Sequence, residues 1–171
     1  MIKFIRNISL VVVMIFFLLQ KGAAQRFNFA FEQFTSDDGL SHDNVLNITK
    51  DKDGFLWLGT ANGLNRFDGL SFKIFRNDPD KPQTIPGNYI AGTTRDKKGF
   101  LWVATNNGLC RIDTRTMKID RVDLRSPEDK YARYEVMWGE FDSSGTGWYM
   151  VNDFLYAINQ ETLKWKRYLL P

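Results

Sequence analysis

Short runs of apolar and polar residues alternate with turns rich in glycine, asparagine and aspartate along residues 45–76. The runs are Val45–Lys50, Phe55–Thr60, Leu64–Phe67 and Ser71–Arg76. They contain many aromatic residues, which fit the pleated surface of a sheet. The pattern predicts four short β-strands, which we call A to D in chain order.

Tight turns separate the predicted strands. Asp51–Gly54 follows strand A, Ala61–Gly63 follows strand B, and Asp68-Gly69 follows strand C. Glycine is favoured at such turns because it adopts positive φ at little cost, and Asp-Gly is a hairpin dipeptide. The turns therefore predict a four-stranded unit made of consecutive strands.

This unit repeats with a period of 45 to 46 residues. Residues 51–68 and 96–113 are identical at twelve of eighteen positions, and residues 142–159 share six of eighteen with the second copy. Four strands in about 45 residues, with Trp and Gly at fixed offsets, are typical of a β-propeller blade. The residues that mark the repeat are Gly54, Trp57, Gly63, Leu64, Gly99, Trp102, Gly108, Leu109, Gly145, Trp148 and Leu155. Because they recur in the units, we expect them to serve packing and turns rather than binding.

The predicted fold is all-β: a partial β-propeller of about three four-stranded blades. The blades are expected at about 44–76, 89–121 and 134–168, within an incomplete propeller covering 44–171. Residues 25–43 precede it as an N-terminal strand followed by a polar segment. Phe27–Phe34 aligns with strand D of the first unit, as expected of a strand that closes a propeller ring.

The first 24 residues are typical of a cleaved signal peptide. Lys3 and Arg6 precede the apolar run Leu10–Leu19, and Gly22-Ala23-Ala24 gives small residues before Gln25. The alternative is a membrane anchor, but ten apolar residues fall short of the roughly 20 that span a bilayer. The sequence therefore predicts an exported protein.

Charge and cysteine content exclude several classes of function. The net charge is +3, but Lys3, Arg6 and Lys21 lie in the signal segment, and the remainder has twenty basic and twenty acidic residues. Nucleic-acid binding is therefore not expected. The single cysteine, Cys110, and single histidine, His42, exclude a disulfide framework and most zinc sites. No metal and no cofactor is predicted, and Cys110 is expected to be a buried apolar residue.

Aspartates precede the turns between strands A and B in all three units. Asp51-x-Asp53-Gly54 has some likeness to a calcium loop, but glycine and glutamate do not follow at the required spacing. We expect Asp51, Asp96 and Asp142 to cap backbone N–H groups instead.

Several motifs resemble two-component regulator propellers, the periplasmic sensor modules of hybrid two-component histidine kinases. They are Phe34–Ser41 (FTSDDGLS), Asn44-Val45 and residues 51–69 (DKDGFLWLGTANGLNRFDG). The resemblance covers residues 27–125 well and 134–168 weakly. In the third unit, Val151–Phe154 stands where Thr-x-Asn-Gly is expected, which puts that B–C turn in doubt but not the strands.

The resemblance implies a sensory role without catalysis in this chain. Members look like a signal peptide, two propellers, a β-sandwich, a membrane helix that anchors them in the inner membrane, a histidine kinase, a receiver and a DNA-binding domain. They sense oligosaccharides. No kinase motif is present here, so the chain is expected to be an N-terminal piece or a truncated product. The implied partners are the remaining blades or domains, a possible homodimer and an oligosaccharide, with membrane contact only through C-terminal parts.

Candidate ligand-binding residues are those that depart from the repeat. Trp138 aligns with Asn47 and Gly92, Tyr134 with Asp43 and Asn88, and Tyr89 with Asn44. Flat aromatic faces stack on sugar rings, so Tyr89, Tyr134 and Trp138 are candidates, as is Tyr131. His42, in the polar segment before the first strand, is a further candidate. The alternatives are packing against a neighbouring blade for the aromatics and simple solvent exposure for His42.

Two rival functions stay open: a catalytic propeller of the sialidase or lyase type, and a purely structural interaction scaffold. Catalysis is disfavoured because few polar residues depart from the repeat. The loops between strand D and the next strand A are long and varied, so we expect any ligand at the end of the blades that carries them. Three blades are fewer than the four to eight of a closed propeller, so association or partial unfolding is expected for residues 25–171 alone.

Overall fold

The computed structural model describes residues 30–127 and 133–170. The predicted signal segment and Tyr131 lie outside these residues, and both remain predictions. The chain divides into two compact units, Met1–Gln33 and Phe34–Pro171. In the first unit, residues 30–33 are exposed and belong to no helix or strand. The described part of the predicted closing strand Phe27–Phe34 is thus not a strand, and it has no ladder partner among the described residues.

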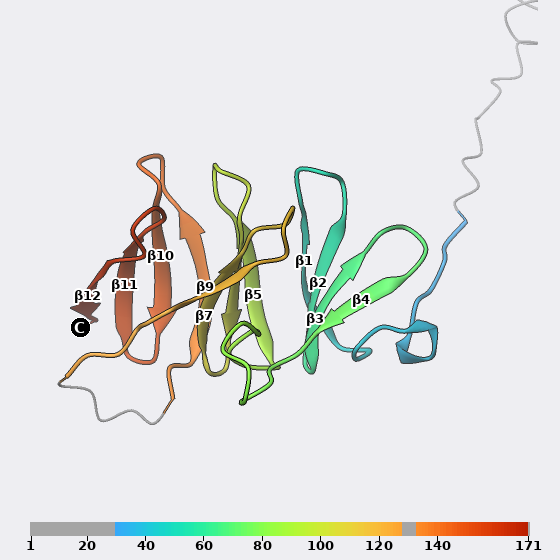
Figure 1. Ribbon diagram of the computed structural model, residues 1–171, viewed down its shortest axis with the longest axis horizontal. Coiled ribbons are helices and arrows are strands. Elements are labelled where there is room, and N and C mark those ends of the chain that lie inside the picture. The colour runs from blue at the N-terminus through green and yellow to red at the C-terminus, as the bar shows by residue number, and fades with distance from the viewer. Residues whose placement is uncertain (1–29, 128–132, 171) are drawn as a thin grey trace, which may run out of the picture. The chain divides into compact units, whose positions relative to one another are not determined.

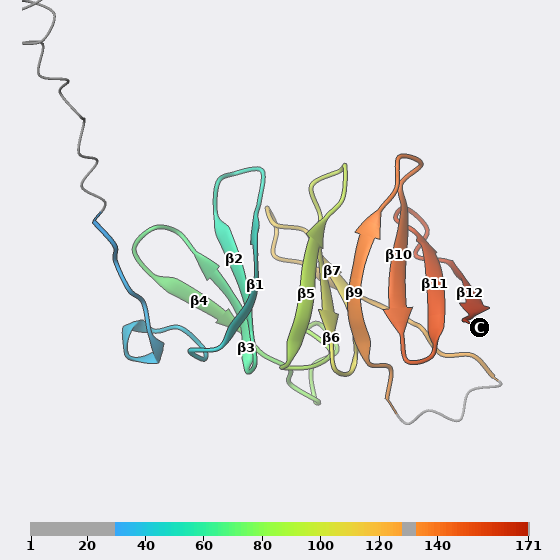
Figure 2. The same cartoon turned by 180° about the vertical axis from the view of Figure 1, so that it is seen from behind.

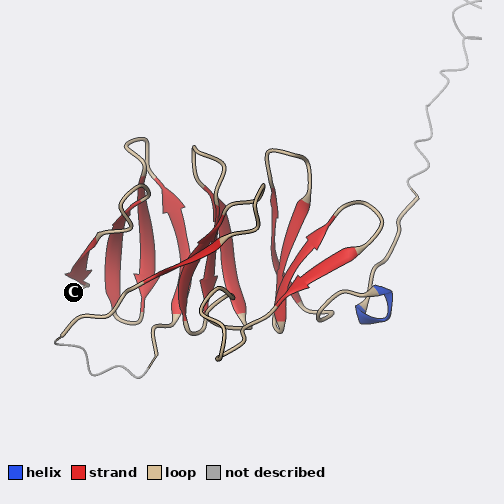
Figure 3. Cartoon of the chain, viewed as in Figure 1, coloured by secondary structure: helices blue, strands red, loops and turns tan. Residues whose placement is uncertain are grey.

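Strands of the second unit form three antiparallel four-stranded sheets (Figures 1 and 3). Blade 1 contains β1 (Val45–Lys50), β2 (Leu56–Thr60), β3 (Gly63–Phe67) and β4 (Phe72–Phe75). Blade 2 contains β5 (Ile90–Arg95), β6 (Leu101–Thr105), β7 (Gly108–Ile112) and β8 (Ile119–Val122). Blade 3 contains β9 (Val136–Phe141), β10 (Thr146–Val151), β11 (Phe154–Asn159) and β12 (Trp165–Leu169). A short 3₁₀ turn, Ser36–Asp38, precedes blade 1. The predicted all-β fold of four-stranded blades is confirmed.

A carboxylate organises each A–B turn, as the sequence predicts. The Asp51 side chain accepts two backbone N–H groups of its own turn through Oδ1, and the Trp57 indole N–H through Oδ2 at 2.8 Å. The same indole contact recurs at 2.9 Å in the pairs Asp96–Trp102 and Asp142–Trp148. One side chain thus shapes the turn and fixes the tryptophan that follows it.

Positive φ angles occur at the turn glycines. In the A–B turns these are Gly54 (96°), Gly99 (89°) and Gly145 (85°), and after the B–C turns they are Gly63 (135°) and Gly108 (129°). The third blade has no glycine after its B–C turn, and Asn152 within that turn takes the left-handed conformation instead, with φ 50°. Asparagine tolerates this region better than most residues, so β10 and β11 still pair despite the altered sequence.

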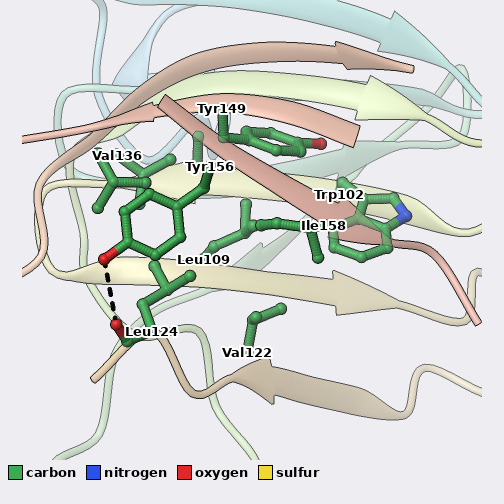
Figure 4. Packing of buried hydrophobic residues seen from close by; sticks show 10 residues of the cluster. Trp102, Leu109, Val122, Leu124, Val136, Tyr149, Tyr156 and Ile158 are labelled. Carbon is green, nitrogen blue, oxygen red and sulfur yellow. Dashed lines mark hydrogen bonds between the residues drawn. The ribbon is translucent and has the colours of Figure 1, made fainter. Parts of the chain in front are cut away.

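The sheets pack face to face, with the repeated tryptophan between them. Trp57 and Trp102 are fully buried (0% exposed) because each packs into a cluster with apolar residues of the following blade. Figure 4 shows Trp102 in the cluster with Val136 and Tyr149 of blade 3. Trp148 holds the same repeat position in blade 3 and is 37% exposed. The repeat leucines Leu64 and Leu109 are also fully buried, and Leu155 is half-buried.

Strand A of each blade lies beside strand A of the next, so β1, β5 and β9 are neighbours (Figures 1 and 2). The Thr49 hydroxyl donates to the Thr93 carbonyl at 3.0 Å, which joins β1 to β5. The Thr94 hydroxyl donates to the Gly139 carbonyl at 2.6 Å, which joins β5 to β9. Side-chain hydrogen bonds therefore hold the three inner strands together. No helix in the described part of the chain is long and apolar enough to cross a membrane.

Candidate functional site

The D–A loops and the B–C turns lie at one end of the blades, and the A–B and C–D turns lie at the other (Figure 3). In blade 2, the Asn106 N–H of the B–C turn donates to the Tyr89 carbonyl at 3.1 Å. Asn107 Nδ2 of the same turn donates to the Pro86 carbonyl of the D–A loop at 3.1 Å. We call this the D–A/B–C end. The long loops of the blades, which are the D–A loops, lie at this end.

A hollow of about 360 Å³ opens at the D–A/B–C end, beside the first residues of the three inner strands. We call it the aromatic hollow. It is lined by Leu46, Tyr89, Ala91, Asn106, Glu135, Met137 and Trp138. Each of the three blades contributes to it, so no single repeat unit contains this site.

Irregular pairing of the inner strands brings side chains to the aromatic hollow. The register of β1 against β2 and of β5 against β6 shifts at Leu46 and Ala91. In β9, Met137 and Trp138 together stand opposite the single residue Met150 of β10. Such bulges bend a strand and re-aim its side chains. Four of the seven residues that line the hollow lie at these irregularities: Leu46, Ala91, Met137 and Trp138.

Trp138 is one of the most exposed aromatic side chains of the described chain, at 59%. Its ring lies against β5 at Gly92, where a methyl group on the glycine would stand 3.2 Å from Trp138 Cδ1. The equivalent position in blade 1 is Asn47, which is half-buried. Trp138 therefore packs on a neighbouring blade, which is one of the two roles weighed from the sequence, and it also presents a large apolar surface to solvent.

Tyr89 stands beside it, 42% exposed, and two polar residues complete the aromatic hollow. The Asn106 Oδ1 atom is buried without a hydrogen-bond partner among the described residues. Glu135 contributes an exposed carboxylate. Its backbone N–H donates to Asn152 Oδ1 at 3.0 Å and is therefore not free to bind a ligand. The hollow thus offers two aromatic faces and an exposed carboxylate.

The other two candidates lie elsewhere. Tyr134 is half-buried against the core cluster of blades 2 and 3 and lines a different hollow, of about 350 Å³, with Pro86, Arg121 and Leu124. His42 is exposed before blade 1, where its Nδ1 accepts the Asn44 backbone N–H at 2.9 Å. The structure brings Tyr89 and Trp138 together, and it does not place Tyr134 or His42 in the aromatic hollow.

Five residues of the aromatic hollow were not singled out from the sequence: Leu46, Ala91, Asn106, Glu135 and Met137. Leu46, Ala91 and Met137 share one repeat position, directly after the first residue of strand A. Their common direction follows from the strand irregularity, which the residue pattern does not reveal. Asn106 belongs to the repeated B–C turn and looks structural in the sequence. Its unsatisfied Oδ1 is visible only in three dimensions.

The described residues contain no group of three or more His, Cys, Asp and Glu side chains placed to hold a metal ion. The A–B turn carboxylates are engaged otherwise. Hydrogen bonds from Ser144 and the Trp148 indole lower the pKa of Asp142 well below its usual value. Burial raises the pKa of the Cys110 thiol to about 12, so this cysteine is a thiol at neutral pH. Neither group has the features of a reactive centre.

Comparison with known proteins identifies the repeats. Residues 39–62 and 84–107 match the family model of the two component regulator propeller. Each match runs from the segment before strand A into the B–C turn of blades 1 and 2. These two segments are therefore similar to two-component regulator propeller repeats, as the resemblance in the sequence indicates.

Longer proteins contain similar regions. Over 81 residues the chain is 49% identical to histidine kinase P4 of Formosa agariphila, and this aligned region covers 47% of the chain and 6% of the kinase. The fold of the chain is similar to that of the extracellular domain of the hybrid two-component system BT3049 from B. thetaiotaomicron, with a TM-score of 0.72 and 27% identity. That alignment covers 82% of this chain and 21% of the other. The chain thus spans only a small part of the relatives it matches.

Catalytic propellers share the fold at a greater distance. Virginiamycin B lyase from Staphylococcus aureus aligns with a TM-score of 0.55 and 17% identity, over 73% of this chain and 41% of the lyase. Likeness at this level concerns the fold alone. It carries no catalytic residue over to this chain.

Proposed function

We propose that this chain is a periplasmic sensory segment of a two-component signalling system, and that it recognises an oligosaccharide in the aromatic hollow without altering it chemically. The observation that supports this most is the pair of exposed aromatic side chains, Tyr89 and Trp138, beside one hollow at the D–A/B–C end. The sensor context is supported by the repeats and by the hybrid two-component system with a similar fold.

The physical basis is the match between aromatic rings and sugar rings. A sugar presents a face of C–H groups, and burying it against Tyr89 or Trp138 removes apolar surface from water on both sides. Hydroxyl groups at the ring edge need polar partners, and the exposed Glu135 carboxylate is an acceptor at the same hollow. An apolar hollow with a few polar groups is the usual composition of a ligand site.

The polar groups favour recognition over catalysis. Glycoside hydrolysis uses a pair of carboxyl groups on either side of the scissile bond. Among the described residues that line the aromatic hollow, Glu135 is the only carboxylate. A purely structural scaffold would not explain why Tyr89 and Trp138 are both exposed in one hollow. It also predicts that no small molecule binds.

Binding by the full chain tests the proposal. The chain is immobilised at low density, and binding of a panel of oligosaccharides is followed by biolayer interferometry. Trp138→Ala should weaken binding about tenfold or more, the loss expected when a stacking contact worth about 1.4 kcal/mol is removed. Tyr89→Ala, for a residue 42% exposed, should also weaken binding, whereas Tyr168→Ala, for a residue 47% exposed on the outer strand β12, should not.

Two results would contradict the proposal. One is that no oligosaccharide binds the folded chain. The other is that Trp138→Ala and Tyr89→Ala bind as tightly as the natural sequence. Chromatography of the panel after incubation separates recognition from catalysis, because a lyase or hydrolase would change the length or unsaturation of the ligand.

A further inference from the structure

A second hollow lies at the same end of blade 2, and it shares one residue with the aromatic hollow. Its volume is about 230 Å³, and it is formed by the D–A loop before β5, the B–C turn of blade 2 and Arg133. We call it the amide hollow. It is lined by Asn77, Pro86, Gly87, Asn88, Asn106, Asn107 and Arg133. Asn106 lines both hollows, so a ligand longer than one sugar ring can reach from one to the other.

The two hollows carry opposite charge. Arg133 is the one charged residue among the described residues of the amide hollow, and Glu135 is the one charged residue of the aromatic hollow. The two residues flank Tyr134 just before β9, two positions apart in the chain. A ligand that spans both hollows therefore meets a cation at one end and an anion at the other.

The amide hollow offers hydrogen-bond donors that are not in use. Asn88 accepts the Asn77 backbone N–H through Oδ1 at 2.7 Å, and its Nδ2 has no acceptor among the described residues. The Asn106 side-chain amide makes no hydrogen bond within the described chain, and the Arg133 guanidinium has no ion-pair partner there. Amide and guanidinium N–H groups without acceptors suit an oxyanion, because charge-assisted hydrogen bonds to it are stronger than neutral ones.

We propose that the recognised oligosaccharide is anionic and binds in one direction: a carboxylate or sulfate group lies in the amide hollow against Arg133, and a neutral ring stacks on Trp138. This inference rests on the proposed function, since it specifies the ligand of the same site. Glu135 adds direction, because its carboxylate repels an anionic unit from the aromatic hollow. The charge pair thus selects which ring of the ligand stacks.

Matched pairs of ligands isolate the role of charge. Oligogalacturonides are compared with neutral galacto-oligosaccharides of the same length, and sulfated galactan oligosaccharides with their desulfated forms. The full chain is immobilised and binding is followed by interferometry at fixed salt. The anionic member of a pair should bind about ten- to a hundredfold tighter, the range expected for a hydrogen bond to a charged group. The pair with the larger preference tells carboxylate from sulfate recognition.

Two variants locate the effect. Arg133→Gln keeps N–H donors and removes the charge, so it should abolish the preference for the anionic member, because only that member loses a charge-assisted hydrogen bond. Arg115→Gln, an exposed arginine at the C–D turn of the same blade and therefore at the opposite end, is the matched control and should keep the preference. Trp138→Ala should weaken both members of each pair.

The outcomes separate this inference from the proposed function. If neutral and anionic members bind equally, or if Arg133→Gln keeps the preference, the anionic specificity is wrong and oligosaccharide recognition stands. If Arg115→Gln removes the preference as well, the attraction is general electrostatics and the amide hollow has no special role. If no member of any pair binds, both proposals fail together.

Discussion

Truncation of the repeated tryptophan should destabilise the chain by an amount that depends on the blade. Trp102 and Trp148 hold the same repeat position, and each donates its indole N–H to the aspartate of its own A–B turn at 2.9 Å. They differ in what covers them, since Trp102 is 0% exposed and Trp148 is 37% exposed. Comparing Trp102→Ala with Trp148→Ala therefore isolates the contribution of packing between blades.

The magnitude follows from the area that each ring buries. A tryptophan buries about 150–250 Å², and about 25 cal/mol per Å² gives about 4–6 kcal/mol for full burial. Measured Trp→Ala losses in cores are about 3–5 kcal/mol. Trp102 has a ring centroid 5.1 Å from that of Phe141 and 6.1 Å from that of Tyr149, both in blade 3. We expect Trp102→Ala to lower the free energy of unfolding by about 4 kcal/mol, and Trp148→Ala by about half as much.

Urea titration followed by circular dichroism measures both losses, at a protein concentration where light scattering shows a monomer. Dichroism is preferred to fluorescence because each variant removes one of the five tryptophans. Equal losses would refute the reasoning, since they would mean that another surface covers Trp148 in solution or that the indole hydrogen bond, not the packing, dominates. A loss below about 1 kcal/mol for Trp102→Ala would refute the burial argument itself.

Further outcomes are expected from the same structure. The pKa of Asp142 is lowered from its usual value of 3.8, so the carboxylate stabilises the fold at pH values above 3.8 and this stabilisation is lost as the pH falls further. Asp142→Asn should therefore show a smaller loss of thermal stability between pH 5 and pH 2 than the natural sequence. Cys110, with its pKa raised to about 12, should react with a thiol reagent at pH 8 only after unfolding. Residues 25–171 should associate or aggregate in size-exclusion chromatography with light scattering, and a cooperative monomer at micromolar concentration would contradict this. Export from a bacterium should yield an N-terminus at Gln25, as terminal sequencing can check.

The repeat made most of the fold predictable. The turn glycines and turn aspartates act within single blades, so short stretches of sequence are enough to predict their roles. Gly54 takes positive φ, and Asp51 caps its own turn. The predicted strand Val45–Lys50 is β1 residue for residue, β2 and β3 differ from the predicted strands by one residue at one end, and β4 is one residue shorter at each end. The third blade was harder because its B–C turn lacks glycine, and the structure resolves this with Asn152.

The candidate site was harder to predict from the sequence, because residues of three different blades form it. Trp138 and Tyr89 were found because each replaces a polar or small residue of the repeat. Tyr134 gives the same signal, yet it packs against the core beside blade 3. A departure from the repeat therefore indicates a local change, but the direction of the side chain depends on pairing irregularities such as the one opposite Met150.

Two departures taken together carry more information than either alone. Gly92 and Trp138 share one repeat position in adjacent blades, and the smallest residue of the one lies against the largest of the other. Inner strands of neighbouring blades lie side by side, so a small residue in one blade leaves room that a large residue in the next can fill. Asn47, at this position in blade 1, instead donates to the Ile90 carbonyl at 3.0 Å and ties the first two blades together. The same repeat position thus holds a hydrogen bond between blades 1 and 2, and it holds an exposed indole packed on a glycine between blades 2 and 3. This is why the aromatic hollow is asymmetric although the scaffold is repetitive.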